Sequence, residues 1–582
     1  MPLNGLQMNK PAARITALSL SLLLLAGCAT TSVVQAPSPG QQAAATLLEQ
    51  GKPREAAQQL EAEAALARGG TRSQLLADAA FAWHEAGDDA RARLLLGQLQ
   101  ARQLAGASRQ RHALLLAELG VADKQPAAVL QALANQHPDQ LPAALQARWY
   151  LAHAQALEAG GDAFAAAGQR ARAGLQLAGS ARSDNLRAIT RLLGGLDDAS
   201  LSQRSAALPV GDPLYNHAGR ALIGRGLPLP RPFDRDAAWQ VDAGKRPPAD
   251  PDGYRPPLKL AVLLPLSGNL ATAAAPVRDG LLAGYYAETR RRPQLDFIDT
   301  HGTAAGAIAA YDKAVAAGAD FVVGPLGRDE VDALFGRAPL QVPVLALNRG
   351  KDAPPPGSAG FALAPEDDGI MAAEYLLARE RRNVLVIGSS DDNGRRAGAA
   401  FAERFAERGG KVAANLSVAD VPADMGAQLR QAGAVDSVFL AIRGSQARAL
   451  VPQLAMAGLG GVLRVGTSQL ASGTGKAEDD VVLDGIAFPR DSWSARGTAG
   501  LPAAAAVAAE LPTARGAATR LFAFGFDAWK ISGYLEKLAN NPESGLPGAS
   551  GTLHLDGFGN VLRSPAWSTF SGGQPVAIGD GR

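Results

Sequence analysis

Hydrophobic positions in the first part of the chain recur at intervals of three and four residues. From about Gln42 to Arg225 the sequence is dominated by Ala, Leu, Gln, Arg and Glu, which favour helices. Similar segments with a Gly-containing turn occur at residues 48–56, 83–90 and 157–163. Gly51 and Gly87 lie 36 residues apart, and Gly87 and Gly120 lie 33 apart. We expect antiparallel helix pairs that turn at these glycines.

This spacing resembles tetratricopeptide repeats, whose period is about 34 residues. The repeat consensus is incomplete, so an ordinary irregular helical domain remains the alternative. Stacks of helix pairs bind proteins or peptides more often than they perform chemistry. The resemblance therefore predicts a binding domain over residues 42–225, stiff enough to act as a spacer.

A proline-rich segment follows and interrupts the helical pattern. Residues 226–257 form the predicted linker, in which Asp236 to Val241 can hold one short turn. A continuous helix is excluded by Pro228, Pro230, Pro232, Pro247, Pro248, Pro251, Pro256 and Pro257.

From Leu258 onward, continuous apolar runs alternate with helical patterns. Such runs are typical of buried parallel strands, and the alternation predicts an α/β architecture. The expected strands are 259–265, 295–300, 321–324, 342–347, 384–388, 437–442 and 462–466. The expected helices are 274–291, 304–317, 329–337, 368–379, 394–408 and 445–457. Two sheets fit this order, one before and one after roughly Pro365.

The N-terminus has the parts of a secretory signal. Lys10 and Arg14 precede an uncharged apolar run, residues 15–25, which is too short to span a bilayer. The ending Leu-Ala-Gly-Cys resembles the bacterial lipobox, which implies a signal at 1–27 and a lipid-modified Cys28. A plain signal peptide is the alternative. Ala29, in place of Asp, favours the outer membrane by the same resemblance, and residues 28–41 read as a tether.

Composition narrows the remaining classes of function. The chain has 47% hydrophobic residues, a net charge of +2 and a single cysteine in 582 residues. One cysteine permits no internal disulfide, so packing must supply the stability. A concentrated basic face is missing from this pattern, which argues against a nucleic-acid partner. We also expect no cofactor.

Several segments resemble the type I periplasmic binding protein fold. Residues 263–268 end the first predicted strand and residues 323–326 end the third; Val277, Gly280 and Ala283 lie on the helix between them. The resemblance covers about Leu258 to Ser571. It implies a two-lobed α/β domain over 258–582, with the second lobe from about residue 366.

Further segments are similar to the penicillin-binding-protein activator A family, the LpoA lipoproteins. They are residues 346–349, 361–367, 438–441, 485–488 with Trp493, 520–528, 551–553 and 559–563 with Trp567. The segments 489–493 and 501–511 depart from the family pattern. The resemblance implies an outer-membrane lipoprotein that stimulates a class A penicillin-binding protein, a peptidoglycan synthase of the inner membrane. Peptidoglycan itself is a second candidate partner.

The binding-protein resemblance also predicts where a vestigial ligand cleft would lie. Its candidate lining is Ser267, Gly268, Asn269, Gly327, Arg328, Ser389 and Ser390. Amino-acid receptors place hydroxyl groups after the third strand, where this chain has Gly327 and Arg328. Arg328 can bind a carboxylate bidentately, although a salt bridge or helix cap suits it equally. The rival function is therefore a lipid-anchored solute-binding protein that feeds an importer.

Other motifs are incomplete. Residues 391–394 resemble a calcium loop, but Arg395 and Arg396 follow, so a turn with a helix N-cap is the preferred interpretation. Residues 471–476 lack a full phosphate cradle, and the seven histidines are scattered, so we predict no metal site.

No complete catalytic motif occurs, which argues against a peptidoglycan-processing enzyme. The aromatic cluster Phe522, Phe524, Phe526 and Trp529 fits core packing.

Overall fold

The computed structural model describes residues 38–235, 246–472, 474–541 and 545–579. Its contacts divide the chain into two compact units, one made of residues up to Leu119 with Gln136–Leu141, the other of Gly120–Asn135 with Pro142–Arg582. Cys28, most of the predicted tether and the predicted turn at Asp236–Val241 lie outside the described residues. Among the described helices, none is long and apolar enough to cross a membrane.

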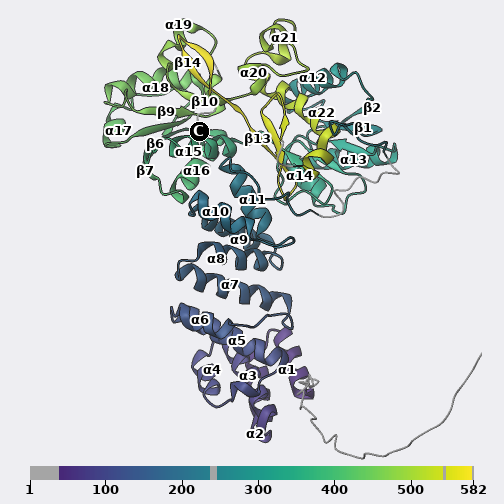
Figure 1. Cartoon of the computed structure of the whole chain (residues 1–582), viewed down its shortest axis with the longest axis vertical. Helices are drawn as coiled ribbons and strands as arrows, with labels where there is room; N and C mark the ends of the chain where they lie inside the picture. The colour runs from purple at the N-terminus through teal and green to yellow at the C-terminus, as the bar shows by residue number, and fades with distance from the viewer. Residues whose placement is uncertain (1–37, 236–245, 473, 542–544, 580–582) are drawn as a thin grey trace, which may run out of the picture. The chain divides into compact units, whose positions relative to one another are not determined.

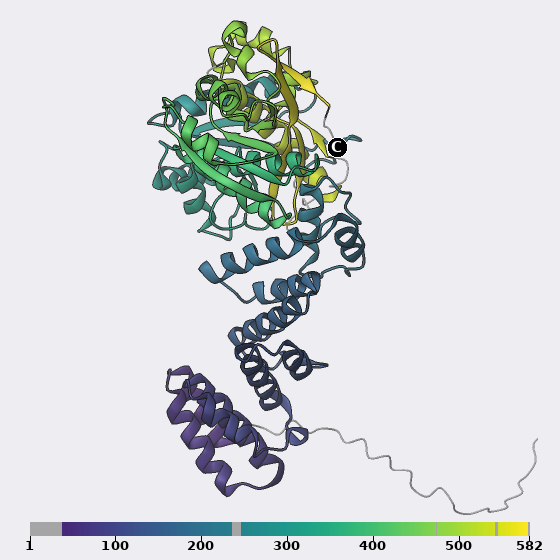
Figure 2. The ribbon, with the colours of Figure 1, turned by 90° about the vertical axis from the view of Figure 1, so that its left-hand side faces the viewer.

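The N-terminal part is helical, as its apolar spacing predicts. Helices α3, α5 and α7 have 17 residues each and begin 37 residues apart, at Gly69, Gly106 and Ala143. Neighbouring helices contact one another as antiparallel pairs, visible for the purple N-terminal helices in Figure 2. The helices are α1 (Pro39–Glu49), α2 (Pro53–Leu66), α3 (Gly69–Glu85), α4 (Asp89–Leu96), α5 (Gly106–Ala122), α6 (Pro126–Leu133), α7 (Ala143–Ala159), α8 (Ala163–Gly174), α9 (Gly179–Gly194), α10 (Asp198–Ala206) and α11 (Tyr215–Gly224).

The predicted glycine turns at Gly51, Gly87 and residues 157–163 are confirmed, the last by Gly161 with a φ of 84°, and the turn at Gly120 is wrong. Gly51 and Gly87 have φ angles of 72° and 77°, in the left-handed region that glycine adopts without strain. Gly120 instead lies inside α5, and the left-handed turn residue is Lys124, with φ 56°. Gly120 serves packing, because a Cβ there would lie 2.9 Å from Val129 Cγ2.

The α/β part contains two mixed sheets, each with the doubly wound order 2-1-3-4-5 in its parallel section. The first sheet runs β11-β12-β13-β5-β4-β3-β1-β2 and the second β15-β14-β10-β9-β8-β6-β7. All seven predicted strands are confirmed. The first sheet consists of β1 (Lys259–Leu264), β2 (Gln294–Asp299), β3 (Phe321–Val323), β4 (Val344–Ala346), β5 (Ala359–Phe361), β11 (Leu546–Pro547), β12 (Thr552–Leu555) and β13 (Asn560–Ser564). The second consists of β6 (Asn383–Ser389), β7 (Lys411–Val418), β8 (Ser437–Ala441), β9 (Leu463–Gly466), β10 (Ala487–Arg490), β14 (Ala566–Ser571) and β15 (Gln574–Ile578).

Helices cover both faces of each sheet, which buries the apolar strands on two sides. All six predicted helices are confirmed, as α12 (Ala271–Ala287), α13 (Ala304–Ala316), α14 (Arg328–Phe335), α15 (Pro365–Leu377), α16 (Asp392–Glu407) and α18 (Gly444–Met456). The others are α17 (Gly426–Gln431), α19 (Ala477–Asp480), α20 (Ser492–Arg496), α21 (Ala504–Glu510) and α22 (Ala518–Asn540). The aromatic residues 522–529 lie in α22 and are buried, which confirms core packing.

The chain crosses between the two lobes three times. It leaves the first sheet after β5, returns after β10, and enters the second sheet again between β13 and β14. Figure 1 shows the yellow C-terminal segment contributing to both lobes. The sequence pattern gave no sign of this return, since it suggested one sheet on each side of residue 365.

Candidate functional site

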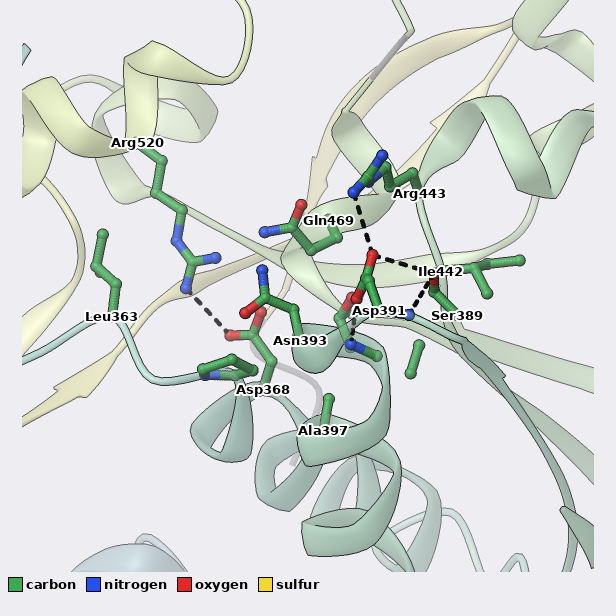
Figure 3. A pocket seen from close by; sticks show the side chains of 14 residues that line it. Leu363, Asp368, Ser389, Asp391, Asn393, Ala397, Ile442, Arg443, Gln469 and Arg520 are labelled. Carbon is green, nitrogen blue, oxygen red and sulfur yellow. Dashed lines mark hydrogen bonds and ion pairs between the residues drawn. The ribbon is translucent and has the colours of Figure 1, made fainter. Parts of the chain in front are cut away.

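The doubly wound topology points to the space between the lobes. In such sheets ligands bind beyond the carboxyl ends of the strands, where the strand order reverses. A pocket of about 50 Å³ lies there, shown in Figure 3. That volume holds a few water molecules, whereas small-molecule sites usually measure about 300–1,000 Å³. Its lining includes Asp368, Ser389, Asp391, Arg443, Gln469 and Arg520.

Four charged side chains from the interlobe crossings form one buried cluster, which we call the crossing cluster: Asp368, Asp491, Arg520 and Arg563. Asp368 lies in the first turn of α15 after the first crossing, Asp491 follows β10 at the second, and Arg563 lies near the end of β13 before the third. Arg520 enters from the first turn of α22. The Asp368 side chain is 2% exposed and that of Arg563 4%.

The ion pairs in the crossing cluster are long. Asp368 Oδ1 lies 3.5 Å from Arg520 Nη2 and 3.6 Å from Arg563 Nη2, and Asp491 Oδ1 lies 3.8 Å from Arg563 Nη1. Charge-assisted hydrogen bonds usually measure about 2.7–2.9 Å. Within the described residues, Nε and Nη2 of both arginines have no hydrogen-bond partner. The cluster therefore holds opposite charges together without satisfying their full hydrogen-bonding capacity.

Burial dominates the electrostatics of this cluster. It raises the pKa of Asp491, although the neighbouring arginines oppose the shift. It also lowers the pKa of Arg563 because the charged guanidinium loses water. Asp368 Oδ2 accepts two hydrogen bonds from Ser468, one from its amide at 3.0 Å and one from its hydroxyl. The pairing of both signs is what makes these buried charges tolerable.

Of the seven predicted cleft residues, the structure brings only Ser389 into the pocket lining. Ser267 is exposed and donates a hydrogen bond of 2.6 Å to Asp299. The Gly327 amide donates to Glu330 Oε2 at 2.6 Å, and the exposed Arg328 begins α14. Local partners thus occupy polar groups that a ligand would need. Gly268, Asn269 and Ser390 are also exposed and lie outside the lining.

Sequence reasoning missed the crossing cluster, although Arg520 and Arg563 lie in segments that carry the family resemblance. Arg520 directly precedes the aromatic run of α22, and Arg563 closes the segment 559–563. The sequence did offer one signal of buried charges, namely a charged residue directly beside a strongly apolar run. The partners could not be paired from sequence, because Asp368 and Arg563 are separated by almost 200 positions.

Asp391 caps the N-terminus of α16, which confirms the predicted helix cap in preference to a calcium loop. Its carboxylate accepts a hydrogen bond of 2.8 Å from the Gly394 amide at the start of α16. It also accepts from Ser389 Oγ at 3.0 Å and pairs with Arg443 at 3.1 Å. These contacts hold its pKa below the usual range against the effect of burial.

The last helices of the repeat region and the segment that follows them contact both lobes. On the first lobe, the Arg235 guanidinium donates to the carbonyls of Ala539, Leu555 and Asp556 at 2.7, 2.9 and 3.0 Å. Burial lowers the pKa of Arg235 to about 10. On the second lobe, Arg408 after α16 lies 3.4 Å from Asp198 of α10. Asn216 of α11 also donates to the Gly557 carbonyl of the first lobe at 3.2 Å, so helices α10 and α11, with the segment that follows them, bridge the two lobes.

A wide groove lies beside this bridge. It measures about 1710 Å³ and lies between helices α8–α11 and the two lobes. Its described lining mixes basic groups, such as Arg182, Arg220 and Arg379, with acidic groups such as Glu374 and Glu403. The mixture offers no single electrostatic preference.

Two doubly wound lobes joined by three crossings define the class: a two-lobed α/β domain of the periplasmic-binding-protein type, preceded by helical pairs. The chain belongs to the family described as "LppC putative lipoprotein", whose model matches residues 50–207, 254–432 and 422–573. The match includes both the helical and the α/β part.

Known proteins support this assignment. The chain is 33% identical over 156 residues to a protein of Photobacterium profundum named penicillin-binding protein activator LpoA, covering 26% of this chain and 25% of that protein. It is 25% identical over 323 residues to the protein of the same name from Pasteurella multocida, covering 55% of each. The matched segments thus span between a quarter and about half of these relatives. A monoclinic crystal form of Haemophilus influenzae LpoA shares the fold, with a TM-score of 0.53, 20% identity, and coverage of 90% of this chain and 98% of that one.

Proposed function

We propose that this protein is a non-catalytic outer-membrane lipoprotein that binds and activates a class A penicillin-binding protein, and so promotes peptidoglycan synthesis. The observation that carries the proposal is the family match over both halves of the chain, together with relatives named as activators. The lipobox-like ending at Cys28 supports an anchored protein on the periplasmic side of the membrane. Several acyl chains hold a protein on a membrane far more stably than one.

The interlobe pocket argues against the rival function of solute capture. A volume of about 50 Å³ cannot enclose an amino acid, and the charges around it already face one another. The described lining contains Asp, Arg, Ser, Thr, Asn and Gln, but no His, Cys, Lys or Tyr. Its charged side chains pair with one another, Asp368 with Arg520 and Asp391 with Arg443, as at a fixed junction between lobes, which supports an activator that acts by binding.

The direct test adds the chain lacking residues 1–28 to a purified class A synthase. We expect faster glycan polymerisation or crosslinking, in proportion to complex formation. Unchanged rates with a synthase shown to be active would contradict the proposal. Calorimetry with free amino acids is the parallel test, because micromolar binding would favour the solute receptor.

Placement in the outer membrane is tested by substitutions beside the anchor. Cys28→Ala should release the protein from membranes and abolish most of its effect in cells. Ala29→Asp should keep the lipid but retain the protein in the inner membrane, and Ala29→Ser is the matched control that should behave as wild type. Full complementation by Cys28→Ala would refute the need for an anchor.

A further inference from the structure

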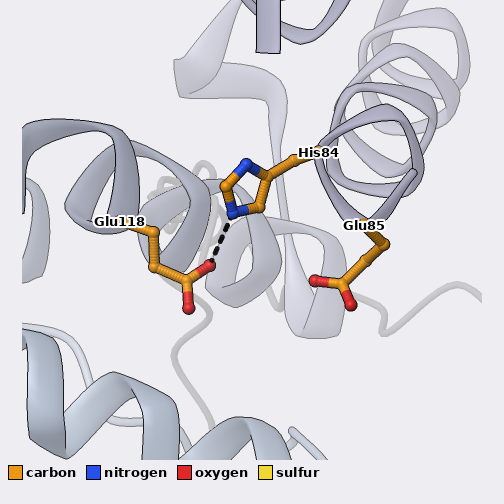
Figure 4. A group of neighbouring side chains, drawn as sticks. All are labelled: His84, Glu85 and Glu118. Carbon is orange, nitrogen blue, oxygen red and sulfur yellow. Dashed lines mark ion pairs between the residues drawn. The ribbon is translucent and has the colours of Figure 1, made fainter. Parts of the chain in front are cut away.

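A histidine and two glutamates converge between helices α3 and α5, away from the interlobe pocket. His84 and Glu85 end α3, and Glu118 lies in the last turns of α5. One ligand atom from each of the three lies within 4.8 Å of the others. In Figure 4 the Glu85 and Glu118 carboxylates lie on either side of the space next to the His84 ring.

The closest pair lies near the separation that a bound metal requires. His84 Nε2 lies 3.2 Å from Glu118 Oε2. Bond lengths of about 2.0–2.2 Å in a tetrahedral zinc site place neighbouring ligand atoms roughly 3.3–3.5 Å apart. The Glu85 side chain is exposed, and its ligand oxygen lies within 4.8 Å of the other two ligand atoms.

A fourth residue orients the imidazole. Asp89, the first residue of α4, has Oδ1 2.6 Å from His84 Nδ1. Metal-binding histidines almost always donate their second ring N–H to a carboxylate or carbonyl, which fixes the tautomer and strengthens the other nitrogen as a ligand. Here that interaction leaves Nε2 facing Glu118.

The donor set selects a class of ion. Calcium and magnesium prefer oxygen ligands alone, whereas an imidazole nitrogen with carboxylates suits zinc and its transition-metal neighbours. Two carboxylates and a neutral histidine give the site a charge of −2, which balances a divalent cation. Three protein ligands leave a fourth tetrahedral position for water.

We propose that His84, Glu85 and Glu118 form a binding site for a divalent transition-metal ion of the zinc class, oriented by Asp89. The ion would link α3 to α5 inside the first compact unit, so its binding would stabilise this helix pair. Nothing in the proposed activation of a synthase requires this site, and the two proposals can fail separately.

The test is calorimetric titration of the full mature lipoprotein, kept in detergent and stripped with a chelator, with zinc chloride. We expect one saturable site, lost in His84→Ala and in the nearly isosteric Glu118→Gln. Asp89→Asn should weaken binding about 10-fold, because outer-shell partners typically contribute about 10–100-fold in affinity. The matched control is His301→Ala: its Nδ1 lies 3.1 Å from one carboxylate, Asp299, and its loss should leave zinc binding unchanged.

A folding defect must be separated from loss of the site. Glu85→Gln changes an exposed side chain and should weaken zinc binding while circular dichroism stays as in wild type. The proposal is overturned if the wild-type chain shows no saturable binding. It is equally overturned if binding survives in both His84→Ala and Glu118→Gln.

Discussion

Removing Asp368 should destabilise the α/β part more than any surface substitution, because it leaves two buried arginines without their shared counter-charge. The Asp368, Arg520 and Arg563 side chains are 2%, 17% and 4% exposed. Breaking a buried pair costs about 3–5 kcal/mol. The separations of 3.5 and 3.6 Å are longer than ideal, so we expect a loss of about 3 kcal/mol for Asp368→Ala, at the lower end of that range.

Scanning calorimetry measures this effect. Unfolding entropy is about 2.1 cal/mol/K per residue, so for the roughly 325 residues of the α/β part about 3 kcal/mol corresponds to a fall in Tm of roughly 4–5 °C. Asp312 provides the control, because its ion pair with Arg337 is exposed and Asp312→Ala should change stability by less than about 1 kcal/mol. A double-mutant cycle with Arg520→Ala should show a coupling of about 0.5–3 kcal/mol. If Asp368→Ala is no more damaging than Asp312→Ala, the crossing cluster does not stabilise the junction.

Three other perturbations test separate parts of the structure. Arg235→Ala removes three hydrogen bonds to carbonyls and should cost about 3 kcal/mol, seen as faster proteolysis between the helices and the first lobe; unchanged cleavage would contradict the bridge. Asp391→Ala removes the α16 cap and should lower stability by about 1 kcal/mol in thermal melts, whereas Asp391→Asn should retain most of it. In metal-free protein, hydrogen bonds with Glu118 and Asp89 raise the pKa of His84 above 6.5. Glu85 is the third carboxylate near this imidazole. The raised pKa of His84 stabilises the folded protein fully below pH 6.5, and this stabilisation is lost as the pH rises through the pKa of the folded state. If thermal melts over a pH series look the same in His84→Ala as in wild type, the prediction is refuted.

The sequence predicted those elements whose signal is local. Strands such as Leu260–Leu264 are continuous apolar runs because helices cover both faces of the sheet, and the predicted boundaries lie within about two residues of the observed ones. Gly51 and Gly87 were found because the turn between two helices needs a positive φ. Gly120 misled the repeat analysis, since glycine is also used for close helix packing.

The sequence did not predict the strands and helices whose positions depend on residues far away in the chain. Strand β7 carries mixed exposed and half-buried positions at a sheet edge, and β11–β15 pair with strands far away in the sequence. Helix α22 is buried along most of its length, so no polar face marks its period. The predicted cleft residues lie near the right strand ends, but their hydrogen bonds to neighbours such as Asp299 and Glu330 could not be read from the chain.

The contacts also explain how a receptor-like fold can suit a regulatory role. A solute receptor closes its lobes around a ligand, and this requires freely bending crossings and an open cleft. Here each crossing contributes a charge to one buried cluster. Asn216 of α11 contacts the first lobe, and Asp198 of α10 contacts Arg408 of the second. Any closure would have to strain these contacts together. The same features that leave little room for a solute keep the two lobes in one arrangement, and a fixed arrangement is what a protein needs when its outer surface recognises another protein.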